Sequence, residues 1–180
     1  MTDAAPTRSG HVVLVGMMGA GKTTTGRRVA EVLGRPFADS DSLIEAATGR
    51  TVREIFEADG EQAFRRLESE VLARTMSSPA PTVVAAAGGV VLDPANRRLL
   101  GRAGTVVWLR APVGVLVGRV GRSDHRPAVQ ADPRGTLQTM EDARTELYRE
   151  VADVTIDASA PIEEVVAEIV SVVHGREVVS

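Results

Sequence analysis

The chain has 180 residues, a formal net charge of -3 and no cysteine. This length suits one domain with a hydrophobic core, and 43% apolar with 25% charged residues is ordinary for a globular protein. The acidic balance argues against a nucleic-acid partner, and the lack of cysteine excludes disulfides and thiolate metal sites. Residues 1–10 are polar, so we expect a disordered N-terminal tail rather than a signal segment. No apolar stretch approaches the roughly 20 residues that span a bilayer, so we expect a cytoplasmic protein without a membrane partner.

The first predicted strand, Val12–Val15, runs directly into the sequence GMMGAGKT at residues 16–23. A helix is predicted over Thr24–Leu33, where Gly34 ends the apolar pattern. The segment between them matches G-x-x-x-x-G-K-[ST], the P-loop, in which backbone N–H groups and a helix N-terminus hold phosphates. Lys22 is the only lysine among 21 basic residues. A compact ammonium fits where a narrow loop wraps a phosphate, whereas the broad fork of arginine does not.

This motif predicts a site for ATP and Mg²⁺ at the start of the helix. The Lys22 ammonium is expected to bridge the β- and γ-phosphates, and the Thr23 hydroxyl to bind Mg²⁺. The nucleotide-binding residues that we expect from the loop are Gly19, Ala20, Gly21, Lys22, Thr23 and Thr24.

The remaining predicted elements alternate between strands and helices. Strands are predicted weakly near Pro36–Ala38 and clearly at Thr82–Ala86, Thr105–Leu109 and Val154–Ile156. Helices are predicted at Ser40–Ala47, Thr51–Ala58, Glu61–Met76, Ala95–Gly101, Pro112–Val120, Gly135–Glu150 and Ile162–His174. This alternation predicts an α/β fold, a doubly wound five-stranded parallel sheet flanked by helices. Without an internal repeat or a linker, residues 11–175 are expected to form one domain, followed by a C-terminal tail at 176–180.

The segment from Arg119 to Arg134 departs from the alternating pattern, with four arginines, two prolines and little apolar content. It is either a solvated surface loop or a mobile lid whose arginines close over phosphates and exclude water. Beside a P-loop we favour the lid.

Two carboxylates, Asp39 and Asp41, follow the second predicted strand. In a doubly wound sheet the carboxyl ends of the strands carry the ligands, so this pair is expected to face the P-loop. One carboxylate can support Mg²⁺ and its waters, while the other orients or deprotonates an acceptor hydroxyl. Alternatively, Asp39 or Ser40 only caps the next helix, although capping and catalysis are compatible.

The long middle helix carries Arg65 and Glu68 three residues apart, so the two side chains can pair on one face. The pair is either a weak surface salt bridge or a device that holds a guanidinium ready for a substrate carboxylate, and the helix alone favours neither. After the third strand, the glycines of Ala87-Gly88-Gly89 either let backbone approach a ligand or simply make a tight turn.

Together these residues resemble the shikimate kinase family over about His11–His174. The resemblance rests on GMMGAGKT, DSD at 39–41, GEQAFRRLE at 60–68, the glycine turn, Arg126-Pro127 and ARTELYREVAD at 143–153. It implies a P-loop NTPase fold of the nucleoside monophosphate kinase type with a mobile lid. It also implies transfer of the γ-phosphoryl group of ATP to the 3-hydroxyl of shikimate, in aromatic amino-acid biosynthesis. We expect a monomer.

The resemblance also implies roles around the nucleotide. Lys22 and Thr23 would hold phosphate and Mg²⁺, with Asp39 supporting the metal through water. Arg119 would lie against the adenine, with the turn near Pro161 on the other side.

The resemblance further implies how shikimate binds. Asp41 would contact its hydroxyls and act as the base. Arg65 and Arg144 would hold its carboxylate, helped by the backbone of Gly88 and Gly89. The implied catalytic residues are Lys22, Asp41 and Arg126, the last reaching the phosphates from the lid.

Three other functions are known for proteins with a P-loop or a related fold, and the sequence excludes one of them. A gluconate-type or nucleotide kinase would keep the P-loop but not the combination of Arg65, Arg144 and Asp41. A GTPase switch needs N-K-x-D, which is absent because Lys22 is the only lysine. A nucleotide-binding homologue with weak activity has one support, because the family usually has glycine at the position of Ala87. If that position requires positive φ, Ala87 carries a strain cost.

Overall fold

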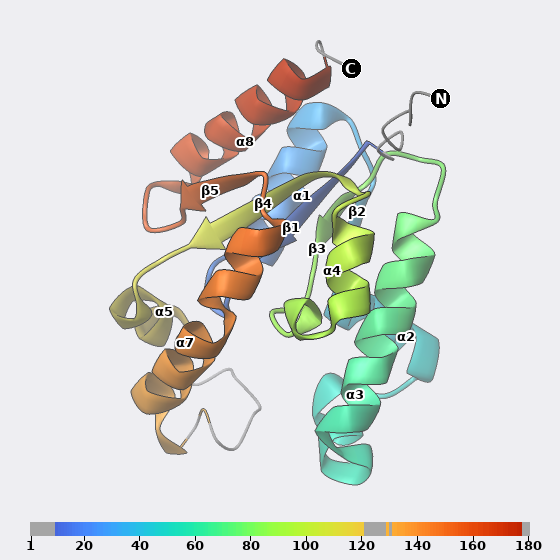
Figure 1. Ribbon diagram of the computed structural model, residues 1–180, viewed down its shortest axis with the longest axis vertical. Coiled ribbons are helices and arrows are strands. Elements are labelled where there is room, and N and C mark those ends of the chain that lie inside the picture. The colour runs from blue at the N-terminus through green and yellow to red at the C-terminus, as the bar shows by residue number, and fades with distance from the viewer. Residues whose placement is uncertain (1–9, 121–128, 130, 178–180) are drawn as a thin grey trace, which may run out of the picture.

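The computed structural model describes residues 10–120, 129 and 131–177, and a five-stranded parallel sheet lies at its centre (Figure 1). The strands are β1 (His11–Val15), β2 (Phe37–Asp39), β3 (Val83–Ala85), β4 (Gly104–Arg110) and β5 (Val154–Asp157). Their spatial order is β2-β3-β1-β4-β5, and every pairing is parallel. The predicted α/β fold is therefore confirmed, including the strand predicted weakly near Pro36–Ala38, which forms at Phe37–Asp39.

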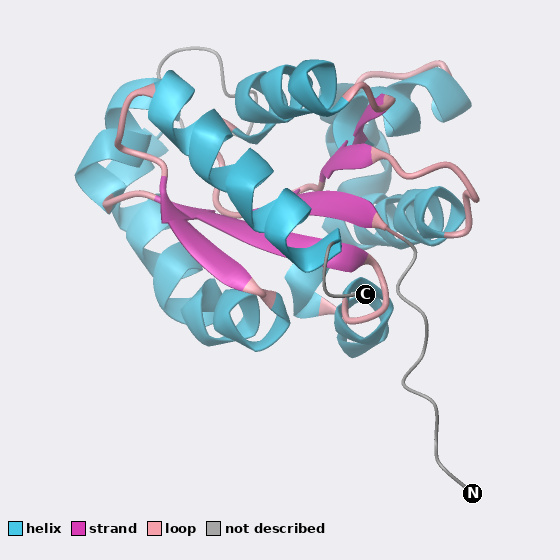
Figure 2. Cartoon of the chain, turned by 90° about the horizontal axis from the view of Figure 1, so that it is seen from above, coloured by secondary structure: helices cyan, strands magenta, loops and turns pink. Residues whose placement is uncertain are grey.

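Helices cover both faces of the sheet (Figure 2). They are α1 (Lys22–Leu33), α2 (Ser40–Thr48), α3 (Val52–Met76), the short 3-10 helix η1 (Val90–Leu92), α4 (Pro94–Leu100), α5 (Val113–Val120), α7 (Pro133–Val151) and α8 (Ile162–Glu177). Helices α1 and α8 contact each other on one face, while α7 contacts α4, α5 and β4 on the other. This three-layer arrangement leaves the carboxyl ends of the strands open for a ligand.

The two helices predicted on either side of Gly60 form one element, α3, with a kink between them. Gly60 has φ 79° and ψ 175°, a conformation that only glycine adopts without strain. Thr51 begins the helix with a capping box, because its hydroxyl accepts from the Glu54 N–H while the Glu54 carboxylate accepts from the Thr51 N–H. The kink redirects the second half of α3, which carries Arg65 and Glu68.

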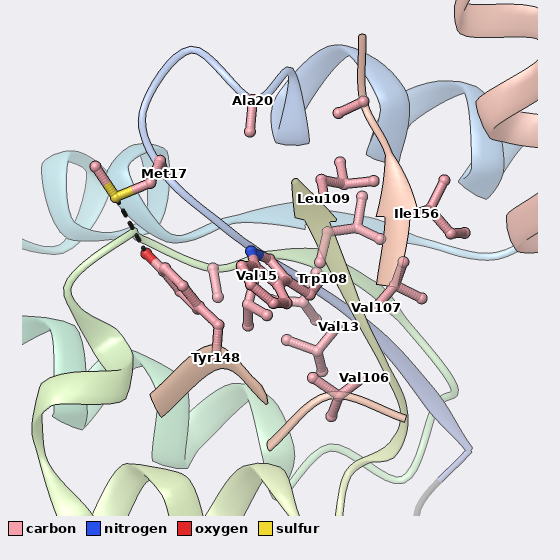
Figure 3. Packing of buried hydrophobic residues seen from close by; sticks show 14 of the residues in the cluster. Val13, Val15, Met17, Ala20, Val106, Val107, Trp108, Leu109, Tyr148 and Ile156 are labelled. Atoms are coloured by element: carbon pink, nitrogen blue, oxygen red, sulfur yellow. Dashed lines mark hydrogen bonds between the residues drawn. The ribbon is translucent and has the colours of Figure 1, made fainter. Parts of the chain in front are cut away.

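Strand β1 forms the middle of the core, since it pairs with β3 on one side and β4 on the other. All four residues of Val12–Val15 are completely buried, which explains why this run reads as continuously apolar. Figure 3 shows Val13 and Val15 within the same buried cluster as Val107 of β4 and Ile156 of β5. The order of connections reverses at β1, so its carboxyl end is where a doubly wound sheet opens a crevice.

A second, smaller core joins α2 to α3. Ile44, Ile55 and Phe64 are fully buried and pack together with Val71. Phe64 and Val71 lie in the second half of α3 and are buried in this core, whereas Leu67 is only partly buried. This packing fixes the side of α3 that faces the turn after β3.

Several expected features fall outside the described residues. These are positions 1–9 of the N-terminal tail, positions 178–180 of the C-terminal tail, and most of the lid, including Arg126. The tail predicted at 176–180 begins later than expected, because α8 continues to Glu177. In the part of the chain that the structure describes, no helix is both long and apolar enough to cross a bilayer.

Candidate active site

A cavity of about 680 Å³ opens at the carboxyl ends of the strands, beside the P-loop. It brings together residues that are widely separated in the sequence and that are predicted to bind nucleotide, metal or substrate. Those that line it are Gly19, Ala20, Gly21, Lys22, Thr23, Thr24, Asp39, Asp41, Gly88, Arg119 and Arg144.

The glycine-rich loop is shaped by contact with the neighbouring strand. Gly16 has φ 143°, and a Cβ atom there would lie 2.4 Å from the carbonyl oxygen of Leu109 in β4. The loop can therefore pass β4 only with glycine at this position. Helix α1 begins at Lys22, directly after Gly21, which adopts a left-handed conformation. Because the first residues of α1 line the cavity, the positive N-terminal end of the helix dipole faces it.

The Lys22 ammonium lies across the loop that precedes it. Its Nζ donates to the carbonyl oxygens of Gly16 and Met17, both at 2.9 Å. Neutral carbonyls are weaker acceptors than phosphate oxygens, which gain charge-assisted bonds. The ammonium is thus held at the mouth of an anion site by partners that a phosphate can replace.

The side chain of Asp39 does two things at once. Its Oδ1 accepts from the N–H groups of Asp41 and Ser42 and so caps α2, while its Oδ2 accepts from the Thr23 hydroxyl at 2.7 Å. The capping alternative is therefore correct, but it uses only one of the two carboxylate oxygens. The other oxygen accepts a hydrogen bond from Thr23, the residue expected to bind Mg²⁺.

The hydroxyl of Thr23 and the carboxylate of Asp39 fit Mg²⁺, a hard cation that prefers oxygen ligands. No cluster of three or more histidine or acidic side chains that could hold a metal occurs among the described residues. Mg²⁺ commonly binds through one or two protein oxygens and completes its shell with waters and substrate phosphates. Thr23 and Asp39 together would form such a site, in which most ligands of Mg²⁺ come from water and phosphate.

Asp41 lies in the first turn of α2 and faces the cavity. It is half-buried, and Ser40 before it is buried. Its carboxylate therefore meets the same cavity as the P-loop, which is the arrangement needed to accept a proton from a bound hydroxyl.

Two side chains of α7 converge on the carbonyl oxygen of Gly88. Arg144 donates from Nη1 at 3.2 Å, and the Tyr148 hydroxyl donates at 2.6 Å. They are one helical turn apart, so both project from the same face of α7. Burial raises the pKa of Tyr148 to about 12, although the nearby Arg144 charge opposes the shift, so the phenol remains a donor at neutral pH. Tyr148 lies in the segment 143–153 that carries the family resemblance, but the sequence alone assigns it no role.

Arg65 is held by two carboxylates of its own helix. Its Nη1 donates to Glu68 at 2.6 Å, and its Nη2 donates to Glu61 at 2.8 Å. Burial works to lower the pKa of Arg65, but the charges and hydrogen bonds of Glu68 and Glu61 outweigh it and raise that pKa above its ordinary value. The predicted pair with Glu68 is confirmed, and the carboxylate is only 2% exposed, so it is more than a surface salt bridge.

The turn after β3 lies between the two arginines. A Cβ atom on Gly89 would lie 1.8 Å from Nη1 of Arg65, so the guanidinium occupies the space that any other residue would fill. Arg144, on α7, donates a hydrogen bond to the carbonyl oxygen of the neighbouring Gly88. Arg65 and Gly89 do not line the cavity itself but a hollow next to it, between α3 and the segment that follows the turn.

The residues expected around adenine are partly brought together. Arg119 lines the cavity and donates from Nη1 to the carbonyl oxygen of Ala158 at 2.7 Å. Ala160 and Ile162 also line it, whereas Pro161 between them is exposed and does not. The turn is therefore near Arg119, but its apolar neighbours, rather than the proline, face the space.

Ala87 carries no backbone strain, because every positive-φ residue in the described part of the chain is a glycine. The strain considered from the sequence is therefore absent. Ala87→Gly should lower the free energy of unfolding by about 0.5–1 kcal/mol, since glycine gains backbone entropy in the unfolded state. Urea unfolding of the two proteins measures the difference. An increase in stability would show instead that this position favours glycine.

The chain also resembles known proteins in sequence. The family model described as Shikimate kinase matches residues 18–174. A shikimate kinase of Ruegeria pomeroyi is 46% identical over 169 residues, covering 92% of this chain and 86% of the relative. A shikimate kinase of Symbiobacterium thermophilum is 45% identical over 170 residues, covering 92% of this chain and 97% of the relative.

Solved structures show the same similarity. The shikimate kinase of Acinetobacter baumannii in complex with shikimate superposes with a TM-score of 0.87 at 40% identity, covering 92% of this chain and 93% of that one. A gluconokinase of Sinorhizobium meliloti has a TM-score of 0.66 at 23% identity, with 95% of each chain covered, and so shares the fold alone.

Proposed function

This chain belongs to the shikimate kinase family, and we propose how the residues around its cavity transfer the γ-phosphoryl group of ATP to the 3-hydroxyl group of shikimate. The observation that best supports the assignment of roles is the turn at Gly88 and Gly89. It lies between Arg144 and Arg65 at the edge of a cavity that also holds the P-loop. A phosphate site and a carboxylate site next to each other suit a substrate that is both an alcohol and an acid.

The nucleotide is proposed to bind with its phosphates against residues 19–24. The N–H groups at the start of α1 and the Lys22 ammonium supply the positive side of that site. When phosphate arrives, Lys22 would exchange the carbonyls of Gly16 and Met17 for phosphate oxygens. Arg119 and the apolar residues next to Pro161 would hold the adenine, and Arg126 remains a proposed phosphate ligand outside the described residues.

Thr23 would bind Mg²⁺ through its hydroxyl, and Asp39 would hold the metal through a water. When bound, Mg²⁺ neutralises negative charge on the β- and γ-phosphate oxygens. Because Asp39 also caps α2, the metal site and the helix that carries Asp41 are mechanically linked through one side chain.

In the proposed reaction, the 3-hydroxyl oxygen of shikimate forms a bond to the γ-phosphorus. The bond from that phosphorus to the β–γ bridging oxygen breaks, and ADP leaves with the electron pair. The hydroxyl proton passes to Asp41, which also orients the hydroxyl before transfer. Lys22 stabilises the charge that spreads over the transferring group.

Asp41→Asn should lower kcat at least about a hundredfold, the low end for loss of a general base. The amide keeps the size of the side chain but cannot accept the proton, so orientation and proton transfer are lost together. Steady-state kinetics at saturating shikimate and ATP measure the effect, with Asp142→Asn on the exposed face of α7 as the control. If only KM rises, Asp41 binds substrate without acting as a base.

An ADP-release assay across a small panel of acceptors tests the function itself. With shikimate, gluconate and nucleoside monophosphates offered separately, ADP should form rapidly only with shikimate. ADP release with gluconate or a nucleotide would favour the alternative small-molecule kinase. ATP binding without turnover of any acceptor would favour a nucleotide-binding homologue.

The protein is further proposed to act as a cytoplasmic monomer.

A further inference from the structure

The Tyr148 hydroxyl occupies a position where the two halves of the site meet. Its short bond goes to the carbonyl oxygen of Gly88, and it also lies 3.9 Å from the sulfur of Met17 in the P-loop. Figure 3 shows the phenol pointing at Met17 from α7. A phenol has one proton, and the 2.6 Å separation assigns it to Gly88.

The ring of Tyr148 is held in place by packing, independently of its hydroxyl group. It is 1% exposed and stacks on Trp108 of β4, with ring centroids 5.6 Å apart and planes inclined by 24°. Stacking on the central sheet and attachment to α7 leave the oxygen little freedom. The hydroxyl is therefore a rigid donor rather than one that follows the turn as the turn moves.

The carbonyl oxygen of Gly88 accepts hydrogen bonds of unequal length from two donors. Tyr148 makes the shorter bond, while Nη1 of Arg144 contributes a longer one at 3.2 Å. Without the phenol, the carbonyl would be left to Arg144 alone, and a guanidinium is a strong charged donor. Arg144 would then be drawn toward the backbone and away from a ligand.

We propose that Tyr148 is a positioning residue, whose hydroxyl holds the Gly88 carbonyl so that Arg144 keeps its other N–H groups aimed at the carboxylate of the substrate. The inference rests on the proposed function, since it concerns how the same site binds shikimate. It predicts that loss of the hydroxyl weakens binding of shikimate but not of ATP, because the hydroxyl acts through Arg144 and not through the phosphates.

Tyr148→Phe is the direct test, since it removes one oxygen and keeps the ring on Trp108. Initial rates should show KM for shikimate raised about tenfold, which corresponds to about 1.4 kcal/mol. The values of kcat and of KM for ATP should stay within about twofold of the wild type. A merely structural role would move all three values together or none of them.

Thr82→Val provides a matched control, because it also removes a buried hydroxyl that donates to a carbonyl, here that of Ala80 at 2.8 Å. Thr82 directly precedes β3, at the end of the strand opposite the turn. The control should lose thermal stability without a change in either KM.

A double-mutant cycle tests whether Tyr148 acts through Arg144. In the Arg144→Lys background, Tyr148→Phe should raise KM for shikimate by less than about twofold, because the group it positions is already gone. Fully additive effects would overturn the proposal, as would an unchanged KM in Tyr148→Phe alone. A Tyr148→Phe protein that does not fold would also overturn it, by showing that the hydroxyl holds the fold.

The wild-type protein in the same assay separates this inference from the proposed function. If the wild type does not phosphorylate shikimate, the proposed function fails. If it does, and Tyr148→Phe has wild-type constants, only the role of Tyr148 fails.

Discussion

Replacing Lys22 by methionine should lower kcat by about 10³-fold or more while leaving the fold intact. Methionine fills a similar volume but carries no charge, so it cannot stabilise the transferring phosphoryl group. In the structure, Nζ makes two bonds to carbonyls at the edge of a cavity, and these contribute little to stability beside the buried sheet. Steady-state kinetics and urea unfolding together separate the two effects.

Two control variants make the Lys22 result specific. Arg53→Met removes a cation from an exposed pair with Glu57 on α3 and should leave kcat unchanged. Lys22→Arg keeps the charge but replaces a compact ammonium with a broad fork, so it should also lose most activity. Wild-type turnover in Lys22→Met would contradict the assignment of the P-loop.

Much of the fold follows from patterns that are local in sequence. Val12–Val15 is apolar at every position because β1 is buried on both faces, so the sequence reveals a central strand without knowledge of its neighbours. The glycine at position 60 marks a break between two helical patterns, and the structure has the kink there. The strand order and the 3-10 helix η1 were not predicted. Order depends on which crossovers pack, and η1 is only three residues long.

The site was predictable where one motif fixes one role, and less so where the role depends on a distant contact. Helical spacing predicts that Arg65 can reach Glu68, and it does. Spacing says nothing about Gly89, whose missing side chain makes room for that guanidinium. The same limit hid the role of Tyr148, because its hydroxyl meets a carbonyl 60 positions away. Only the folded sheet brings the end of β3 to the face of α7.

Shikimate carboxamide should be a very poor substrate compared with shikimate itself. Arg65 and Arg144 reach the Gly88–Gly89 turn from separate helices. In the proposed site, the substrate carboxylate accepts N–H bonds from both. The amide has no charge and presents NH₂ donors to groups that can only donate. By analogy with sites that reject an analogue lacking the expected partner, kcat/KM should fall by roughly 10⁴-fold.

Arginine-to-lysine substitutions connect this discrimination to the two residues. Arg65→Lys and Arg144→Lys keep the charge but lose the planar fork. Each should therefore raise KM for shikimate and reduce the ratio of kcat/KM between shikimate and its carboxamide. Arg66 on α3 and Arg149 on α7 are exposed neighbours of these residues on the same helices. As controls, Arg66→Lys and Arg149→Lys should leave the ratio of kcat/KM values for shikimate and its carboxamide unchanged. Equal turnover of acid and amide by the wild type would mean that both arginines only support the turn. Recognition of the acceptor would then rest on its hydroxyl groups and on Asp41, and the site would suit alcohols that carry no acid.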